Sequence, residues 1–400
     1  MWRYSPINEL SLDDFAPAAG PEPAASKGSA EARELFESLR TTLGRTAASV
    51  LVQNGQAVEG SWSNTRGNPA TFEFGPADEV AAATDMLGSV QREGDALVRL
   101  NDAFMPDPIF LDVPRGVSVE GPVLVVHWCD PESAAFPRLC VRAGIDAAVS
   151  VVEVFAGPTA RGMQRSLAVP VTELMAAEDA SLSYLSLQTL SDSAWHLARL
   201  SARGGRNSSL RTFTVGLGAA YDRVRTDVTV DGKDARSEIL SAYLGEGTQV
   251  HDIRTLQDHA APRTNSELLC QGAVAGRSRS VYSGLIRVQR GAVRSDARQT
   301  NLNLVLDEGA HADSVPNLDI LENDVKCSHA STVGPVDEDQ RYYIESRGVA
   351  PDVAESLIVR GFFDAIIERG PVPEATALLE SEVHVRLDAA LADRQVVAGV

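Results

Sequence analysis

A cysteine and a histidine are separated by a single residue in the segment Asp324-Val325-Lys326-Cys327-Ser328-His329. If this segment is extended, the two-residue period of a strand places Cys327 and His329 on the same face. A thiolate beside an imidazole can hold iron, zinc or the edge of an iron–sulfur cluster. Two ligands do not close such a site, so further ligands must come from elsewhere, and a partner chain is one source. The plainer alternative is that Cys327 only packs, since free cysteine is among the most buried residue types.

Two further histidines, His251 and His259, are flanked in sequence by Asp252 and Asp258. A carboxylate beside each imidazole could orient a ligand or tune a base. No third ligand follows at metal spacing, which favours the simpler interpretation that both histidines are polar groups at turns or at an interface. His127 lies in an apolar run, and we expect it to be a core histidine.

The signatures of common enzyme classes are missing from the sequence. There is no phosphate-binding G-x-x-x-x-G-K-[ST] loop, because the one Gly-Lys pair, Gly232-Lys233, is followed by Asp234. There is also no G-x-S-x-G elbow and no H-E-x-x-H pair. The four cysteines lack C-x-x-C spacing, which disfavours a zinc ribbon or a disulfide framework. We therefore predict that the chain is not an enzyme and does not itself hydrolyse ATP.

Composition narrows the class of protein further. The 400 residues include 36 Lys and Arg against 55 Asp and Glu, a net charge of -19, which would repel a nucleic-acid backbone. The amino-terminal residues are polar and acidic, and no apolar stretch reaches the length of a membrane span. These features predict a soluble cytoplasmic protein that binds neither nucleic acid nor membrane.

The elements that must position these residues fall into three regions. Residues 1–110 have a linker-like stretch and two helical patterns, Glu31–Leu43 and Val80–Ala103, which predict a mixed, helix-bearing domain. Residues 111–335 contain many short β-branched runs bounded by Gly, Asp or Asn. Their spacing of roughly 8–12 residues predicts a sandwich, a barrel or a parallel β-helix, and periodicity alone leaves all three open.

Residues 336–400 predict a helical tail, because apolar residues recur there at helical spacing. One face carries Leu357, Ile358, Phe362 and Ile366, close to the acidic residue Asp352. Such a face either packs on the β domain or docks a partner, and the pattern does not decide between them.

Several phrases in the carboxy-terminal half, taken together, resemble the SufB/SufD family of iron–sulfur cluster assembly proteins. They are ARQTNLNLVL at 297–306, PNLDILENDVKCSH at 316–329, ASTVG at 330–334 and RYYIESRG at 341–348. The phrase VKCSH is similar to the SufD branch, because SufB-type chains carry their cluster-building cysteine in a TQCD phrase where this chain has Gln299-Thr300-Asn301. The sequence departs from the family pattern at Asp319 and Ser331, where glutamate and glycine are usual.

This resemblance implies a mainly β protein with a right-handed parallel β-helix core, a helix-bearing amino-terminal domain and a carboxy-terminal helical tail. It also implies a scaffold that contributes His329, with Cys327 as a second candidate ligand, to a site shared with a SufB-type paralogue. That site would hold iron or an iron–sulfur cluster transiently, and no cofactor would stay bound. Asp352 and the apolar face from Leu357 to Ile366 would dock the ABC-type ATPase SufC.

Three alternatives stay open at this point. The chain could be a β-solenoid carbohydrate-active enzyme, or it could itself be the cluster-carrying paralogue. An exposed edge strand near Cys327 to Val333 would also allow a homodimer when the natural partner is absent.

Overall fold

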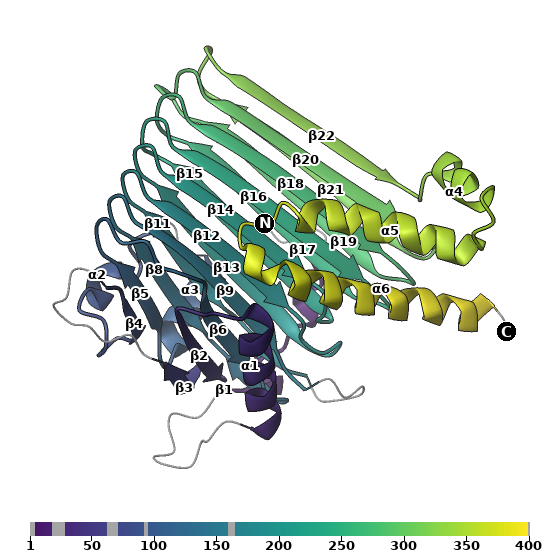
Figure 1. Ribbon diagram of the computed structural model, residues 1–400, viewed down its shortest axis with the longest axis horizontal. Helices are drawn as coiled ribbons and strands as arrows, with labels where there is room; N and C mark the ends of the chain where they lie inside the picture. Colours follow the sequence, from purple (N-terminus) through teal and green to yellow (C-terminus); the bar gives the residue numbers. More distant parts are fainter. Residues whose placement is uncertain (1–4, 18–28, 62–70, 92–94, 159–164, 399–400) are drawn as a thin grey trace.

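Strands dominate the chain from residue 109 to residue 334 and form two facing parallel sheets. The computed structural model describes residues 5–17, 29–61, 71–91, 95–158 and 165–398. Successive long strands alternate between the sheets, and each one pairs in parallel with the strand two places later (Figure 1). This arrangement is a parallel β-solenoid, so the predicted β-helix core is confirmed and the sandwich and the barrel are excluded.

We call the two sheets sheet A and sheet B. Sheet A follows the order β4 (Glu73–Pro76), β5 (Ile109–Val113), β8 (Arg138–Ala143), β11 (Val171–Ala176), β13 (Trp195–Gly204), β15 (Tyr221–Val230), β17 (Val250–His259), β19 (Arg279–Val288) and β21 (His311–Ile320). The short strands β1 (Ala16–Pro17), β7 (Ser133–Ala135) and β10 (Leu167–Ala168) also belong to it. Sheet B follows the order β3 (Gln56–Ser61), β2 (Ala48–Gln53), β6 (Val123–Trp128), β9 (Ala148–Ala156), β12 (Ser181–Gln188), β14 (Ser209–Gly216), β16 (Arg236–Gly245), β18 (Asn265–Val274), β20 (Asp296–Val305) and β22 (Lys326–Gly334).

A stack of left-handed turn residues fixes the register between coils. Asp179, Asn207 and Asp234 occupy the same turn of successive coils with φ between 55° and 67°. Each donates its backbone N–H to a carbonyl of the next coil over 2.9–3.2 Å, and the Asn207 side chain donates to Asp179 at 2.7 Å. Asn and Asp adopt this conformation more readily than most residues, which explains why they recur between the strands.

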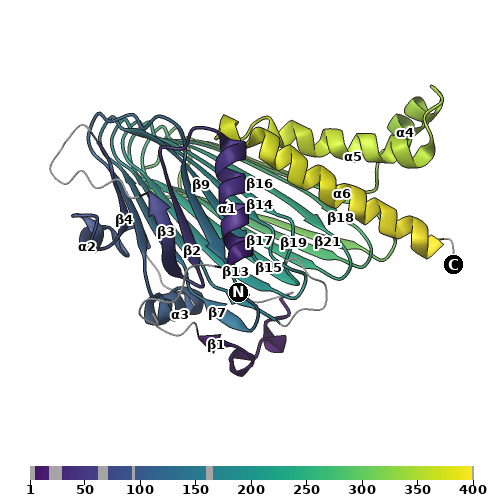
Figure 2. The ribbon, with the colours of Figure 1, turned by 60° about the horizontal axis from the view of Figure 1, so that its bottom comes forward.

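Helices cover the outer face of sheet B (Figures 1 and 2). They are α1 (Ala30–Leu43), α5 (Pro351–Ile367) and α6 (Thr376–Ala398), and a short helix, α4 (Glu338–Glu345), projects beside them. Phe36 of α1 and Phe363 of α5 join outward-facing residues of sheet B, such as Phe213, in one apolar cluster. Short 3-10 helices occur at Ile7–Glu9, Leu12–Asp14 and Pro373–Ala375.

The amino-terminal region is tied directly to the solenoid. β2 pairs in parallel with β6, and β4 pairs antiparallel with β5, so residues before 110 extend both sheets. The prediction of a single helix over Val80–Ala103 is wrong. The segment is divided into α2 (Ala83–Met86) and α3 (Ala96–Phe104), and the chain turns between them at Gly88, whose φ of +73° is left-handed.

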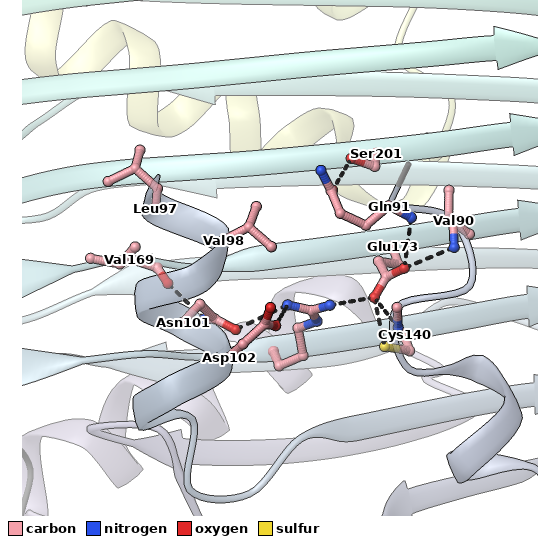
Figure 3. A network of polar contacts seen from close by, with 12 residues as sticks. Val90, Gln91, Leu97, Val98, Asn101, Asp102, Cys140, Val169, Glu173 and Ser201 are labelled. Carbon is pink, nitrogen blue, oxygen red and sulfur yellow. Dashed lines mark hydrogen bonds and ion pairs between the residues drawn. The ribbon is translucent and has the colours of Figure 1, made fainter. Parts of the chain in front are cut away.

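A buried carboxylate anchors this region to the outer face of sheet A. Glu173 of β11 accepts the backbone N–H groups of Gly88, Val90 and Gln91 at 2.8, 2.9 and 3.1 Å. It also accepts from Arg138 at 2.6 Å, while Arg138 reaches Asp102 of α3 at 3.0 Å. In Figure 3, Val90 and Gln91 lie on one side of this network, and Asn101 and Asp102 lie on the other.

Candidate functional site at the open end of the solenoid

β21 and β22 are the last strands of their sheets. In the described part of the chain, β21 pairs only with β19, and β22 pairs only with β20. The backbone groups along the outer edge of each strand are thus available to a further strand, and the interior of the solenoid opens at this end.

Cys327 and His329 lie on the inward face of β22. Cys327 is in register with Ala297 of β20, and His329 is in register with Gln299. Ala297 and Gln299 are fully buried between the sheets, so the residues stacked on them in parallel register face the same way. The structure therefore brings the predicted pair together at the mouth of the solenoid, where His329 is exposed and Cys327 is half-buried.

The surroundings of Cys327 favour a neutral thiol. Its side chain packs against an apolar cluster that includes Ile286, Val288 and Ala297. Burial raises the pKa of the Cys327 thiol above its ordinary value, and the nearby Asp296 carboxylate adds to the effect. A metal ion would have to displace the thiol proton in order to bind this sulfur.

The chain supplies too few donors here for a closed metal site. No group of three or more His, Cys, Asp and Glu residues among the described positions is arranged to hold a metal ion. An imidazole and a thiol provide two ligands, whereas tetrahedral zinc takes four and iron–sulfur clusters use several thiolates. Within the described part of the chain, the donors at this end therefore amount to only part of a metal-ligand set.

Exposed apolar side chains lie on and next to the two end strands. Leu318, Ile320, Leu321 and Val333 are all exposed, Leu321 to 53%. Ser331 of β22 donates to Ser314 of β21 at 2.7 Å, which links the two end strands across the interior. An apolar surface with unpaired strand edges has the character of a surface that another protein covers.

The residues of the predicted docking face have different environments. Ile366 is 0% exposed and lies in the apolar cluster between α5 and sheet B, so a partner could reach it only if α5 left the sheet. Ile358 and Phe362 are half-buried against the same cluster. Leu357 is 50% exposed, and Asp352 is also exposed. A partner could therefore reach Leu357 and Asp352 directly, but not the whole set of residues that the sequence pattern places on this face.

His251 and His259 are inside the solenoid. The adjacent aspartates do not orient them, because alternate residues of a strand face opposite sides, and Asp252 instead accepts from Arg254 at 2.8 Å on the outer face. His251 is 3.3 Å from Asp222, which also contacts His196 at 2.8 Å. The expectation of turn or interface positions is wrong for both histidines.

The contacts of His259 and His127 give each a structural role. His259 contacts the hydroxyls of Thr264 and Ser266, both at 2.7 Å, and burial lowers its pKa to about 4. His127 is buried, as predicted, and contacts Glu153 at 2.8 Å.

The sequence patterns gave no sign of a groove of about 440 Å³ on the outer face of sheet A. Four arginines line it, namely Arg199, Arg225, Arg254 and Arg287. Arg199 pairs with Asp227 at 2.6 Å, and Arg287 pairs with Asp319 at 3.2 Å. Ion pairs within the sheet account for much of this charge.

Comparisons with known proteins indicate the family to which the chain is similar. A family model described as "SUF system FeS cluster assembly, SufBD core domain" matches residues 127–362. An iron–sulfur cluster assembly SufBD family protein of Mycobacterium tuberculosis is 32% identical over 335 residues, which cover 80% of this chain and 78% of the relative. The carbohydrate-active enzyme alternative finds no support in these matches.

Two relatives carry the name iron–sulfur cluster assembly protein SufD. The Bacillus subtilis protein is 27% identical over 302 residues, covering 75% of this chain and 68% of the relative. The Escherichia coli protein is 25% identical over 374 residues, covering 92% and 83%. None of the helices in the described ranges combines the length and apolar character needed to cross a membrane. Because the family model spans more than half of the residues and the mycobacterial relative is matched over most of its length, the chain belongs to the SufBD family of the SUF iron–sulfur cluster assembly system.

Proposed function

We propose that the chain is a non-enzymatic, SufD-type scaffold subunit that works in the cytoplasm with a SufB-type paralogue and a SufC-type ATPase. The observation that carries this proposal is the inward-facing pair Cys327 and His329 at an end of the solenoid whose outer strand edges have no partner strand among the described residues. Two donors on an apolar, uncovered surface suit a site that a second solenoid completes.

The cargo of this site is iron or a nascent iron–sulfur cluster, held only during assembly. The imidazole of His329 is exposed and offers a ring nitrogen to the metal. The half-buried sulfur of Cys327 is the second candidate donor, and its raised pKa makes it the weaker ligand until a metal displaces the proton. Apolar side chains such as Leu321 would exclude water once the paralogue covers the end.

The carboxy-terminal helices are suited to transmit motion to this site. Arg369, just after α5, donates to Glu238 of β16 at 2.6 Å and to Glu267 of β18 at 3.0 Å. Arg386 of α6 donates to the carbonyl of Leu217 at 2.6 Å. ATPase subunits that dock at Leu357 and Asp352 would therefore act on sheet B, whose last strand carries Cys327 and His329.

Co-expression of the chain with its paralogue and its ATPase tests this proposal. We expect a stable three-component complex on size analysis, with iron and acid-labile sulfide present only when all three chains are present. Failure of the chain to bind either the paralogue or the ATPase would contradict the proposal. A stoichiometric cluster on the isolated chain would instead identify it as the cluster-carrying paralogue.

Paired variants of α5 test the docking surface. Leu357→Asp should abolish ATPase binding while the fold is kept, because the side chain is exposed. Ile366→Asp should unfold the helical tail, because it places a charge in the core between α5 and sheet B. Normal ATPase binding by Leu357→Asp would exclude this surface.

A further inference from the structure

A glutamine lies directly beneath the exposed histidine at the open end. Gln299 of β20 is the register partner of His329, and it faces inward with Ala297, Asn301 and Asn303. Adjacent parallel strands are about 4.8 Å apart, which is within the reach of a glutamine side chain. Gln299 is therefore the inward side chain of its coil best placed to contact His329.

The opposite sheet makes room for this carboxamide. A Cβ atom added at Gly284 of β19 would lie 2.5 Å from Nε2 of Gln299 and 2.4 Å from Oη of Tyr282. Any larger residue at position 284 would therefore displace the amide or the phenol. The glycine holds open a space in which the Gln299 amide lies across the interior.

Within the described part of the chain, this amide has no hydrogen-bond partner. Gln299 is 1% exposed, and neither its Oε1 nor its Nε2 is bonded to any residue in the described part of the chain. Its neighbours differ, because Asn303 donates to Asn301 at 2.7 Å and Tyr243 donates to Asn303. An unsatisfied buried amide costs about 1–3 kcal/mol per group, so a fold that keeps one calls for an explanation.

We propose that Gln299 is a positioning residue for His329, an inference that rests on the function proposed above. When a metal ion binds one ring nitrogen of His329, the Gln299 carboxamide turns toward β22. Its Oε1 then accepts the N–H of the other ring nitrogen. Metal-bound histidines commonly donate their second N–H to such an acceptor, which fixes the tautomer and the ring orientation. The Gln299 amide would therefore gain its hydrogen-bond partner only when a metal ion is bound to His329.

The test uses the isolated chain with Zn²⁺ as the probe and Gln299→Met as the variant. Methionine keeps the length of the side chain but removes the amide. We expect the affinity for Zn²⁺, read from the ring ¹⁵N shifts of His329, to fall about tenfold. We also expect the ring N–H of zinc-bound His329 to exchange slowly with water in the wild-type chain and fast in the variant. The metal-free variant should be at least as stable as the wild type, because it loses an unsatisfied amide.

Matched variants separate this role from a structural one. Gln257→Met removes another buried amide, which donates to Ser266 at 2.7 Å, and it should lower stability without changing zinc binding at His329. Gln299→Asn keeps the amide but shortens its reach, so it should reproduce the zinc defect if Gln299→Met does not fold. Unchanged His329 shifts, zinc affinity and N–H exchange in a folded Gln299 variant would overturn the proposal. If His329→Ala leaves cluster assembly intact while the zinc results hold, the proposed function fails and this inference about the side-chain contact stands.

Discussion

Replacing Glu173 by glutamine should weaken the anchor between the amino-terminal region and sheet A. The carboxylate satisfies three backbone N–H groups of residues 88–91 and one guanidinium N–H of Arg138, all within 2.6–3.1 Å. A glutamine has only one oxygen, so its NH₂ group must face either Arg138 and Gly88 or the N–H groups of Val90 and Gln91. In either orientation two buried donors lose their acceptor.

The magnitude follows from these contacts. Two lost buried hydrogen bonds cost about 1 kcal/mol each, and loss of the charge opposite a buried guanidinium adds a further penalty. Arg138 keeps its contact with Asp102 at 3.0 Å, which limits that penalty. We therefore expect Glu173→Gln to lower the free energy of unfolding by about 3 kcal/mol, the lower end of the range for a broken buried ion pair.

Urea unfolding followed by circular dichroism measures this loss, and hydrogen exchange locates it. The amides of Gly88, Val90 and Gln91 should exchange faster in the variant. Glu322→Gln is the matched control, because Glu322 also accepts backbone N–H groups, from Gly291 at 3.0 Å and Asn323 at 2.8 Å, but on the surface. It should have a far smaller effect. A change below about 1 kcal/mol for Glu173→Gln, with unchanged exchange at residues 88–91, would refute the reasoning.

Two other perturbations have defined outcomes. Folding lowers the pKa of His259 from about 6.5 to about 4. As the pH falls through this range, His259 becomes protonated in the unfolded chain while it stays neutral in the folded chain, and this difference favours unfolding. This histidine should remove about 3 kcal/mol of stability by pH 4, and a pH series of urea unfolding should show that this loss is absent in His259→Gln. Gly284→Ala should destabilise the chain by about 1–3 kcal/mol, because its Cβ would lie 2.4 Å from the Tyr282 hydroxyl. Tyr282→Phe should partly restore the thermal midpoint of that variant, and a Gly284→Ala chain as stable as the wild type would contradict this account.

The sequence predicted the strands of the core but could not choose their partners. Inward and outward residues alternate in the same way in a sandwich, a barrel and a solenoid. A pairing such as that of Tyr221 with Val250 cannot be read from the sequence of either strand alone. Resemblance to a family, and not periodicity, selected the β-helix. The helix α1 could be predicted because its signal is local, with apolar residues recurring at helical spacing within one short stretch.

In the candidate site too, residues that are close in sequence could be predicted to lie together, whereas partners on neighbouring coils could not. Cys327 and His329 share a face because they are two residues apart in one strand. The partner of His251 is Asp222 on a neighbouring coil, and Asp252, its neighbour in sequence, points outward. Gln299 is related to His329 only by register between coils, so no sequence motif marks it. Ile366 shares a helical face with Leu357 in the pattern, but the sheet covers only one of them.

The central claim is that His329 supplies a ligand to an assembly site completed by another chain. The most direct measurement is the iron and acid-labile sulfide content of the three-component complex carrying His329→Ala. The variant side chain lies on an exposed strand edge, so the complex should still assemble, but its cluster content should fall severalfold, and Cys327→Ala should have a milder effect. A His329→Ala complex with the full wild-type content of iron and sulfide would contradict the account.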